Sequence, residues 1–431
     1  MPLERRHARI PAAIAIVALA AFAVLWVGAR MPFARGMVAG RITDATGLTA
    51  AIQSLGIGFL PSPTVDIRGL TIAQPPGFGD DPFATVGRLR VRIPWSGIFS
   101  VSELRELSAE DAIVRLVVDR QGIGNWSKLG AEPAADVPPP DGEAADWAIG
   151  SLRLARGAVD YRDLAAGSQW QLAAISLDAD AIEPARAFPF DLKLGGVFGT
   201  NTTHFALKGE GRVDMTAGAY EGRSLAFRGW LGGEPLPLAG AELEGELARA
   251  SYASKSGVAV AEAGRFKFAE VSGKFEGRAD LGAPATEASV AVTTEPFEPR
   301  PTAIILGRPL PATADPAAFA SLQLALTAQL QDGTLRLDPV SGRLDDTTFE
   351  ASLVPAQRHV RASLDRIDLN RYLPKATAPA TASGPKATLE SVVSQLGELD
   401  VDAEIRVEEA RVAGGVLRDA VIRVERTGPT P

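Results

Sequence analysis

The chain has 431 residues, of which 46% are hydrophobic and 22% charged, a composition typical of a folded protein with a substantial core. Its formal net charge of −8 and its pI near 5.2 argue against nucleic-acid binding, which needs clustered Lys and Arg to neutralise phosphates. Cysteine is absent, and the three His residues are too widely spaced to place two imidazoles on one metal ion. These counts exclude disulfides and thiol nucleophiles, and they predict no metal site and no cofactor.

Residues 10–29 form the first predicted element. They are about twenty residues without a charge, long enough as a helix to cross a hydrocarbon core of about 30 Å. Three Arg residues precede this stretch, so the positive-inside rule keeps residues 1–9 in the cytoplasm and sends the rest of the chain across the membrane. In a bacterium, this predicts a single-pass inner-membrane anchor with the bulk of the chain in the periplasm. The alternative is a cleaved signal peptide with Val27 and Ala29 at the cleavage site, but the apolar stretch is longer than usual for one.

Residues 30–130 are predicted to form an N-terminal β region that begins with a short membrane-proximal helix. In this helix, Met37, Ile42 and Ala45 have the spacing of one helical face, and Gly47 is placed to end it.

Beyond the helix the hydrophobic pattern has a period of two, which predicts strands with one apolar and one polar face. In GRLRVRIPW, residues 87–95, apolar side chains alternate with three Arg. The same alternation recurs through a middle β region, residues 147–373, and a C-terminal helix and β segment, residues 389–431. Linkers rich in Pro and Ala, at residues 131–146 and 374–388, separate these regions. Helical spacing recurs in DPAAFASL and TLESVVSQLG, and no βαβ alternation is visible. The prediction is a mainly β protein, with a long antiparallel sheet and a few short helices.

A glycine-rich phrase, DRQGIGNW at residues 119–126, follows a predicted strand and is similar to the start of a phosphate-binding loop. Its glycines are followed by Asn125 and Trp126, whereas a dinucleotide fingerprint requires a helix with an apolar face there. The phrase is therefore predicted to be a turn, with glycines at positive φ and Trp126 packed on the sheet edge.

The acidic residues do not predict catalysis. Asp80 with Asp81 and Asp345 with Asp346 form pairs, but each pair lies in a polar, turn-like stretch where carboxylates are usually solvated. No G-x-S-x-G phrase occurs in the sequence, and His204 is predicted to lie on a surface strand. We therefore expect no enzymatic activity.

Six phrases follow the predicted anchor in a fixed order: PSPTVDIRGLTIAQPPGFGDDPFATVGRLRVRI, VRLVVDRQGIGNW, IGSLRLARGAVDYRD, PATADPAAFASLQLALTAQL, SGRLDDTTFEASL and IDLNRYLP. Their number and order resemble the AsmA family of bacterial inner-membrane proteins, over nearly all of the chain. The resemblance implies a bridge-like carrier that passes phospholipid between the inner and outer membranes. Family members usually continue past VAGGVLRDAVIRVER, so the resemblance also implies a short or truncated member.

A sheet with one apolar face must cover that face, either by folding on itself as a sandwich or by curling into a groove. The periodicity leaves both arrangements open, and the resemblance favours a groove that takes phospholipids. The residues predicted to line this groove are Leu89, Val91, Ile93, Leu116, Val118, Leu324, Leu326, Ile405 and Val407.

Two functions are consistent with these features. The first is a β-groove anchored in the inner membrane that binds or conducts phospholipids between the two membranes and supports outer-membrane homeostasis. The second is a non-enzymatic assembly or regulatory factor that contacts outer-membrane or other envelope proteins through exposed strand edges and affects their targeting or insertion. Neither function needs a cofactor, and nucleic acid is an expected partner of neither.

Overall fold

In the computed structural model, the described residues are 32–98, 103–127, 147–198, 201–233, 236–282, 287–307, 309–331, 333–372, 402–412 and 415–424. Several predictions lie outside these ranges: the cytoplasmic N-terminus, the anchor at 10–29, the linkers at 131–146 and 374–388, and the helix TLESVVSQLG. Within the described ranges, no helix is both long enough and apolar enough to span a membrane.

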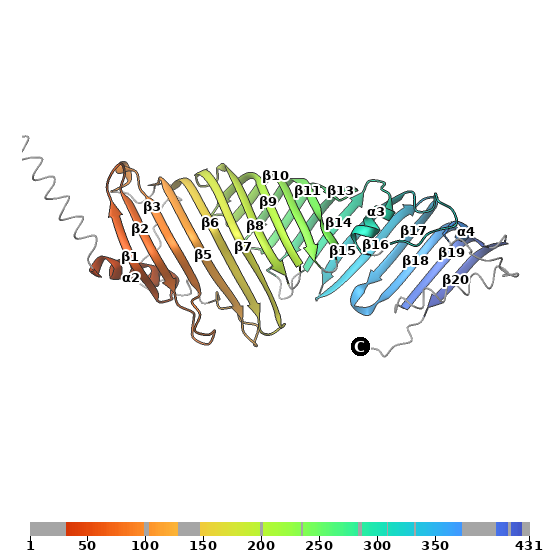
Figure 1. The fold of residues 1–431 in the computed structure, drawn as a ribbon, viewed down its shortest axis with the longest axis horizontal. Helices are drawn as coiled ribbons and strands as arrows, with labels where there is room; N and C mark the ends of the chain where they lie inside the picture. The colour runs from red at the N-terminus through yellow and green to blue at the C-terminus, as the bar shows by residue number, and fades with distance from the viewer. Residues whose placement is uncertain are drawn as a thin grey trace, which may run out of the picture. The chain divides into compact units, whose positions relative to one another are not determined.

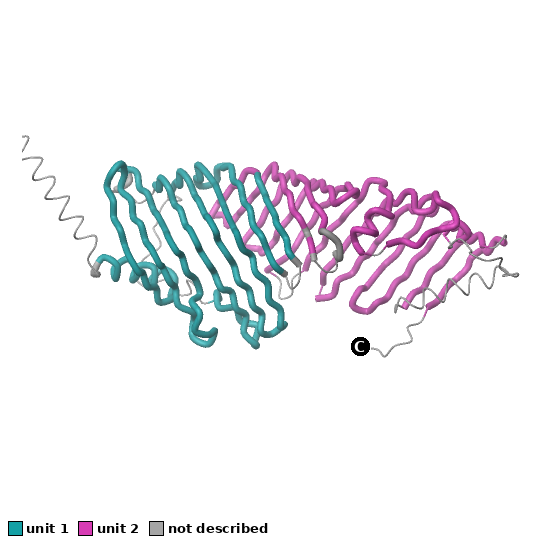
Figure 2. Tube along the Cα trace, in the orientation of Figure 1, with its two compact units in different colours: residues 1–208 teal, residues 209–431 magenta. Residues whose placement is uncertain are grey.

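The protein is mainly β, which confirms the interpretation of the alternating patterns. Its twenty strands belong to one mixed sheet that is not closed, and few helices accompany them in the described ranges (Figure 1). The chain divides into two compact units, residues 1–208 and residues 209–431, which are described separately (Figure 2).

The described residues of unit 1 form one α-helix, one 3-10 helix and the first strands of the sheet. Their bounds are α2 (Pro32–Thr46), β1 (Ala50–Gly58), β2 (Thr64–Ile72), β3 (Ala84–Arg92), η1 (Trp95–Ile98), β4 (Glu103–Leu104), β5 (Glu106–Val118), β6 (Ala148–Asp163), β7 (Ser168–Ile182) and β8 (Ala187–Phe198). The long strands pair in the order β1, β2, β3, β5, β6, β7, β8. The next strand, β9 (Asn201–Asp214), contains the boundary between the units.

The part of unit 2 that the structure describes contains the remaining strands and three short helices. Their bounds are β10 (Ala219–Gly233), β11 (Leu236–Ala253), β12 (Val258–Phe268), β13 (Val271–Asp280), β14 (Glu287–Thr294), α3 (Pro299–Ile305), β15 (Leu322–Gln331), β16 (Thr334–Leu344), β17 (Thr347–Val354), η2 (Pro355–Gln357), β18 (His359–Asp368), α4 (Leu369–Tyr372), β19 (Asp402–Val412) and β20 (Gly415–Val424). From β10 to β20 each strand pairs with the next one in sequence.

The prediction of an antiparallel sheet is wrong at three pairings. Strands β5 and β6, β4 and β6, and β18 and β19 run parallel. A tight turn can join antiparallel neighbours, whereas a parallel pair needs a long crossover connection. The two predicted linkers, 131–146 and 374–388, fall within the connections from β5 to β6 and from β18 to β19. The Pro- and Ala-rich stretches were therefore the sequence signal for parallel pairing.

The predicted membrane-proximal helix is present as α2, and it ends where expected. Gly47 has a φ of 73°, and its amide donates to the carbonyl of Thr43 at 2.8 Å. The predicted apolar face is correct for Ile42 but wrong for Met37 and Ala45, which are exposed. The side chains that pack on the sheet are Ala34, Val38 and Ile42.

The helical prediction for DPAAFASL is wrong, because this phrase forms turns. The Asp315 carboxylate accepts a hydrogen bond from the amide of Ala317 at 2.8 Å, which favours a turn over a helix. Phe319 then takes a left-handed backbone with a φ of 61°. The helix of this region is α3, Pro299–Ile305, which was not predicted.

Candidate binding face of the sheet

An apolar face crosses the strands of unit 1. Register partners on neighbouring strands point to the same side of a sheet. One row of such partners is Leu55, Ile67, Leu89, Ala109, Leu154, Leu177 and Leu192. The next row is Ile57, Val65, Val91 and Leu107. Leu89 and Val91 therefore lie on the same face as apolar residues of the flanking strands.

Several strands of unit 1 contain a residue with a left-handed backbone, and the side chains change face there. Gly69 in β2, Asp111 in β5 and Arg156 in β6 have φ values of 61°, 54° and 53°. In a regular strand, Val86 and Leu89 would point to opposite faces because they are three residues apart. Both nevertheless pack against the same buried cluster. The apolar face therefore continues through the bend.

Part of this face in unit 1 is covered by the chain itself. Leu89 packs with side chains of α2 around one buried cluster, and Leu116 packs against a second. Val118 is only 8% exposed. Val91 and Ile93, at the end of β3, are half-buried. Leu89 and Leu116 are also half-buried, but they pack against buried clusters, and Val118 is buried.

Unit 2 places its four predicted lining residues on one face. One row of register partners is Leu326, Val340, Ala351, Ala362 and Ile405. The adjacent row is Leu324, Gly342, Phe349, Leu364 and Val407. Val407 is 4% exposed, whereas Leu324, Leu326 and Ile405 are half-buried. These three side chains keep apolar surface in contact with water.

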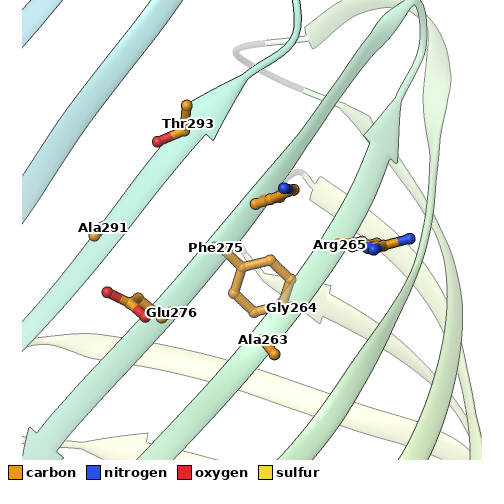
Figure 3. Close-up of a pocket in the computed structure, with 8 residues that line it drawn as sticks. Ala263, Gly264, Arg265, Phe275, Glu276, Ala291 and Thr293 are labelled. Carbon is orange, nitrogen blue, oxygen red and sulfur yellow. The ribbon is translucent and has the colours of Figure 1, made fainter.

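The row of Leu326 continues toward the start of unit 2 through aromatic rings that cover glycines. Val292 and Phe275 extend this row across β14 and β13. The rings of three phenylalanines lie so close to glycines on a neighbouring strand that a Cβ added there would be 2.5 to 2.8 Å from a ring carbon. The pairs are Phe227 with Gly245, Phe266 with Gly273, and Phe275 with Gly264, the last shown in Figure 3.

The three rings form one aromatic surface. The ring centroids of Phe275 lie 6.2 Å from those of Phe227 and 6.3 Å from those of Phe266, within the range of favourable aromatic pairs. Sequence reasoning placed the region of Phe266 in the middle β region but missed the pairing of its ring with a glycine. The signal is an alternation of Gly and Phe two residues apart, as in SGKF and AGRF, and it becomes specific only when the register is known.

The opposite face of unit 1 carries ion pairs. The guanidinium of Arg88 donates to the Asp66 carboxylate from Nε at 3.1 and 3.2 Å, and Arg90 lies 3.8 Å from the same carboxylate. The hydrogen bond from Arg88 holds the pKa of Asp66 below its usual value, against the opposing effect of burial. Arg92 pairs with Glu106 at 2.8 Å. The three arginines of GRLRVRIPW thus form salt bridges within the sheet.

A polar cluster in unit 2 joins distant segments through Asp345. Its carboxylate accepts hydrogen bonds from the amides of Phe319, Ala320 and Ser321 at 2.9, 2.8 and 3.0 Å, and from the hydroxyl of Tyr372 at 2.7 Å. Burial raises the pKa of Asp345, but these hydrogen bonds outweigh burial and hold the pKa below its usual value. The expectation of a solvated carboxylate is therefore wrong for Asp345.

Arg371 completes this cluster. It donates to Asp315 at 2.7 Å and to Asp346 at 3.3 Å, which ties α4 to the turn before β15 and to the turn between β16 and β17. The carboxylates of Asp315, Asp345 and Asp346 thus hold the loops between strands in place. Asp80 and Asp81 are exposed, in agreement with their predicted solvation.

The DRQGIGNW phrase is a turn, as predicted. The Asp119 carboxylate accepts hydrogen bonds from the amides of Gln121 at 2.9 Å and Ile123 at 2.8 Å. Gly122 has a φ of 81°, but the other glycine of the phrase does not have a positive φ. Trp126 remains 40% exposed.

Sequence reasoning missed the role of Asn125 in this turn. Its side chain has no exposed surface, accepts a hydrogen bond from the amide of Val117 at 3.1 Å, and donates to the carbonyl of Arg115 at 2.7 Å and to Gln74 at 2.9 Å. The residue therefore fixes the end of β5.

Comparison with known protein families identifies a matching family. The model of the AsmA family matches residues 13–280, which is more than half of the chain. No curated protein and no solved structure matches it. In the part of the chain that the structure describes, no group of three or more His, Asp or Glu side chains could hold a metal ion.

Proposed function

The chain belongs to the AsmA family, and we propose that it binds phospholipid acyl chains on the apolar face of its sheet and passes lipid between the inner and outer membranes. The observation that carries this proposal is the row of partly exposed apolar side chains that includes Leu326 and Ile405. A contiguous apolar surface in water favours an apolar ligand. The predicted anchor at 10–29 would hold the protein in the inner membrane, with the bulk of the chain in the periplasm.

The dimensions of the row suit an acyl chain. Five strands, β15 to β19, contribute to it, and neighbouring strands lie about 4.8 Å apart, so the row extends over about 19 Å. An acyl chain spans half of a bilayer hydrocarbon core, or about 15 Å. One acyl chain lying across the strands therefore fits within this part of unit 2.

The expected binding energy is low enough for a lipid to be released again and passed on. Full burial of a methylene contributes about 0.8 kcal/mol, and a chain lying against an open face gains about half of that. A dozen methylenes would then contribute about 5 kcal/mol, which corresponds to sub-millimolar binding, on the order of 0.2 mM. Such binding needs no cofactor and no covalent chemistry, so the proposed function is not enzymatic.

Photo-crosslinking in whole cells tests this function. A photoreactive residue placed at Leu326 or Ile405 should give phospholipid adducts, identified by mass spectrometry. The matched controls are their sequence neighbours Thr327 and Glu404, whose side chains point to the opposite face. Lipid adducts confined to the two apolar positions would support the proposal. Protein adducts, or equal labelling at all four positions, would count against it.

A second function, as an assembly or regulatory factor for envelope proteins, is favoured by the edge strand β20. Among the described strands, only β19 pairs with β20. Val416 and Val421 of β20 are 54% and 52% exposed. An edge strand with exposed valines can accept an added strand from a partner. Replacing the alanine of β20, Ala420, by proline would remove one backbone donor, and unchanged recovery of envelope proteins with this variant would argue against the second function.

A further inference from the structure

A cavity of about 300 Å³ lies among β12, β13 and β14 (Figure 3). Arg265, Lys274 and Thr293 line it and are register partners on these strands, so their side chains share one face of the sheet. Phe266, next to Arg265 in β12, points to the opposite, apolar face. A second cavity, of about 450 Å³, lies on the other side of Arg265 and is lined by it as well. Arg265 therefore lines two hollows, and residues of the apolar face, such as Phe275 and Leu247, line them as well.

Two cations face each other at this cavity. Arg265 and Lys274 lie directly opposite each other, and like charges in this position destabilise a sheet. Glu276 lines the same cavity, and Glu246 is the register partner of Arg265 on β11. Within the described residues, neither Arg265 nor Lys274 lies within salt-bridge distance of either carboxylate.

Neighbouring arginines of unit 2 behave differently. Arg228 pairs with Glu244, and Arg249 pairs with both Glu221 and Glu262. Arg228 and Arg249 thus have carboxylate partners, whereas Arg265 and Lys274 face each other beside a hollow. An anion in that hollow would relieve their repulsion.

We propose that Arg265 and Lys274, with the hydroxyl of Thr293, bind a phosphate ester group in the cavity among β12, β13 and β14. The guanidinium offers two parallel N–H donors to phosphate oxygens, the ammonium adds a compact positive charge, and the hydroxyl adds a third donor. The phosphate can belong to a lipid headgroup or to a soluble compound. The two cations belong to the face opposite the acyl-chain row, and Phe275, which extends that row, also lines the cavity.

Titration calorimetry on the full chain in a non-ionic detergent tests the site with two probes: inorganic phosphate and dihexanoyl phosphatidylglycerol. Replacing both cations, Arg265→Gln with Lys274→Gln, should weaken binding by at least about tenfold, because charge-assisted hydrogen bonds are lost. The matched control is Arg336→Gln on β16, which removes one exposed positive charge from unit 2 outside the cavity. This control should bind the probes as the unchanged protein does.

The two probes separate the possible sources of the phosphate. Preferential binding of inorganic phosphate that depends on the two cations supports a soluble ligand, and preferential binding of the phosphatidylglycerol supports a lipid headgroup. The proposal is overturned if neither probe binds, or if Arg336→Gln weakens binding as much as the double variant. Arg265→Lys, which keeps the charge, provides a second check: it should retain more binding than Arg265→Gln, and equal loss in both would contradict the role assigned to the charge.

Discussion

Substitution of Gly264 by alanine should loosen the aromatic surface of unit 2. The added Cβ would lie 2.5 Å from Cζ of Phe275, whereas carbon atoms pack at about 3.5–4.0 Å, so the ring must move by about 1 Å. Overpacking of this kind costs about 1–3 kcal/mol, and the stiffer unfolded chain offsets about 0.4–1 kcal/mol of it. The expected net loss of stability is about 1–2 kcal/mol.

Gly277→Ala is the matched control for this change. Gly277 lies in β13, two residues from Phe275 on the same face, and an added Cβ would meet its nearest atoms at 3.4 Å, an ordinary contact. This variant should be neutral or stabilised by up to about 1 kcal/mol.

Hydrogen–deuterium exchange of peptides from β12 and β13, measured in the full chain, reports the local opening free energy. Faster exchange in Gly264→Ala than in Gly277→Ala, together with fewer lipid adducts at Leu326, is the expected result. Equal exchange in the two variants would refute the claim that the Phe275 ring needs the space left by Gly264.

Three other changes have defined outcomes. The pKa of Asp345 is lowered in the folded protein, so its contribution to stability is present above about pH 4 and is lost as pH falls through the folded-state pKa. Asp345→Asn should therefore lower the thermal unfolding midpoint at pH 7, and the midpoint of this variant should fall less steeply in acid than that of the unchanged protein. Asn125→Ala leaves buried backbone groups of β5 unpaired and should cost about 1–3 kcal/mol, seen as faster amide exchange at Val117, whereas unchanged exchange would contradict this role. Leu326→Asp combined with Ile405→Asp should abolish lipid carriage in a protein that still folds, and normal carriage would reject the proposed face.

The alternation of side chains was sufficient to predict a mainly β fold and to identify candidate apolar residues within single strands. It did not predict which strands are covered by other parts of the chain. Leu89 and Leu326 have the same kind of local pattern and are both half-buried, yet Leu89 packs against a buried cluster that side chains of α2 also contact, whereas Leu326 belongs to no such cluster among the described residues. The difference arises from the position of a helix far along the chain, which no local period encodes.

The bend in unit 1 marks a second limit of sequence reasoning. A left-handed residue inside a strand shifts the alternation by one, and this conformation is uncommon for Arg156, whereas Asp111 is of a type that adopts it more readily. The two lie side by side on β5 and β6, and Arg156 donates from Nε to the Asp111 carboxylate at 2.7 Å. This hydrogen bond spans two strands at the bend, so it could be recognised only once the parallel pairing was known.

The charged face determines where the apolar face lies. A strand that slipped by one residue would turn its charged side chains toward the apolar side and its apolar ones toward water. In β19, such a slip would place Glu404, which pairs with Arg406 and Arg423, among the apolar partners of Ile405. Burying an unpaired carboxylate there would cost far more than the salt bridges contribute at the surface. The ion pairs therefore contribute mainly by making a shifted register unfavourable. As a consequence, the apolar side chains of neighbouring strands stay in one row.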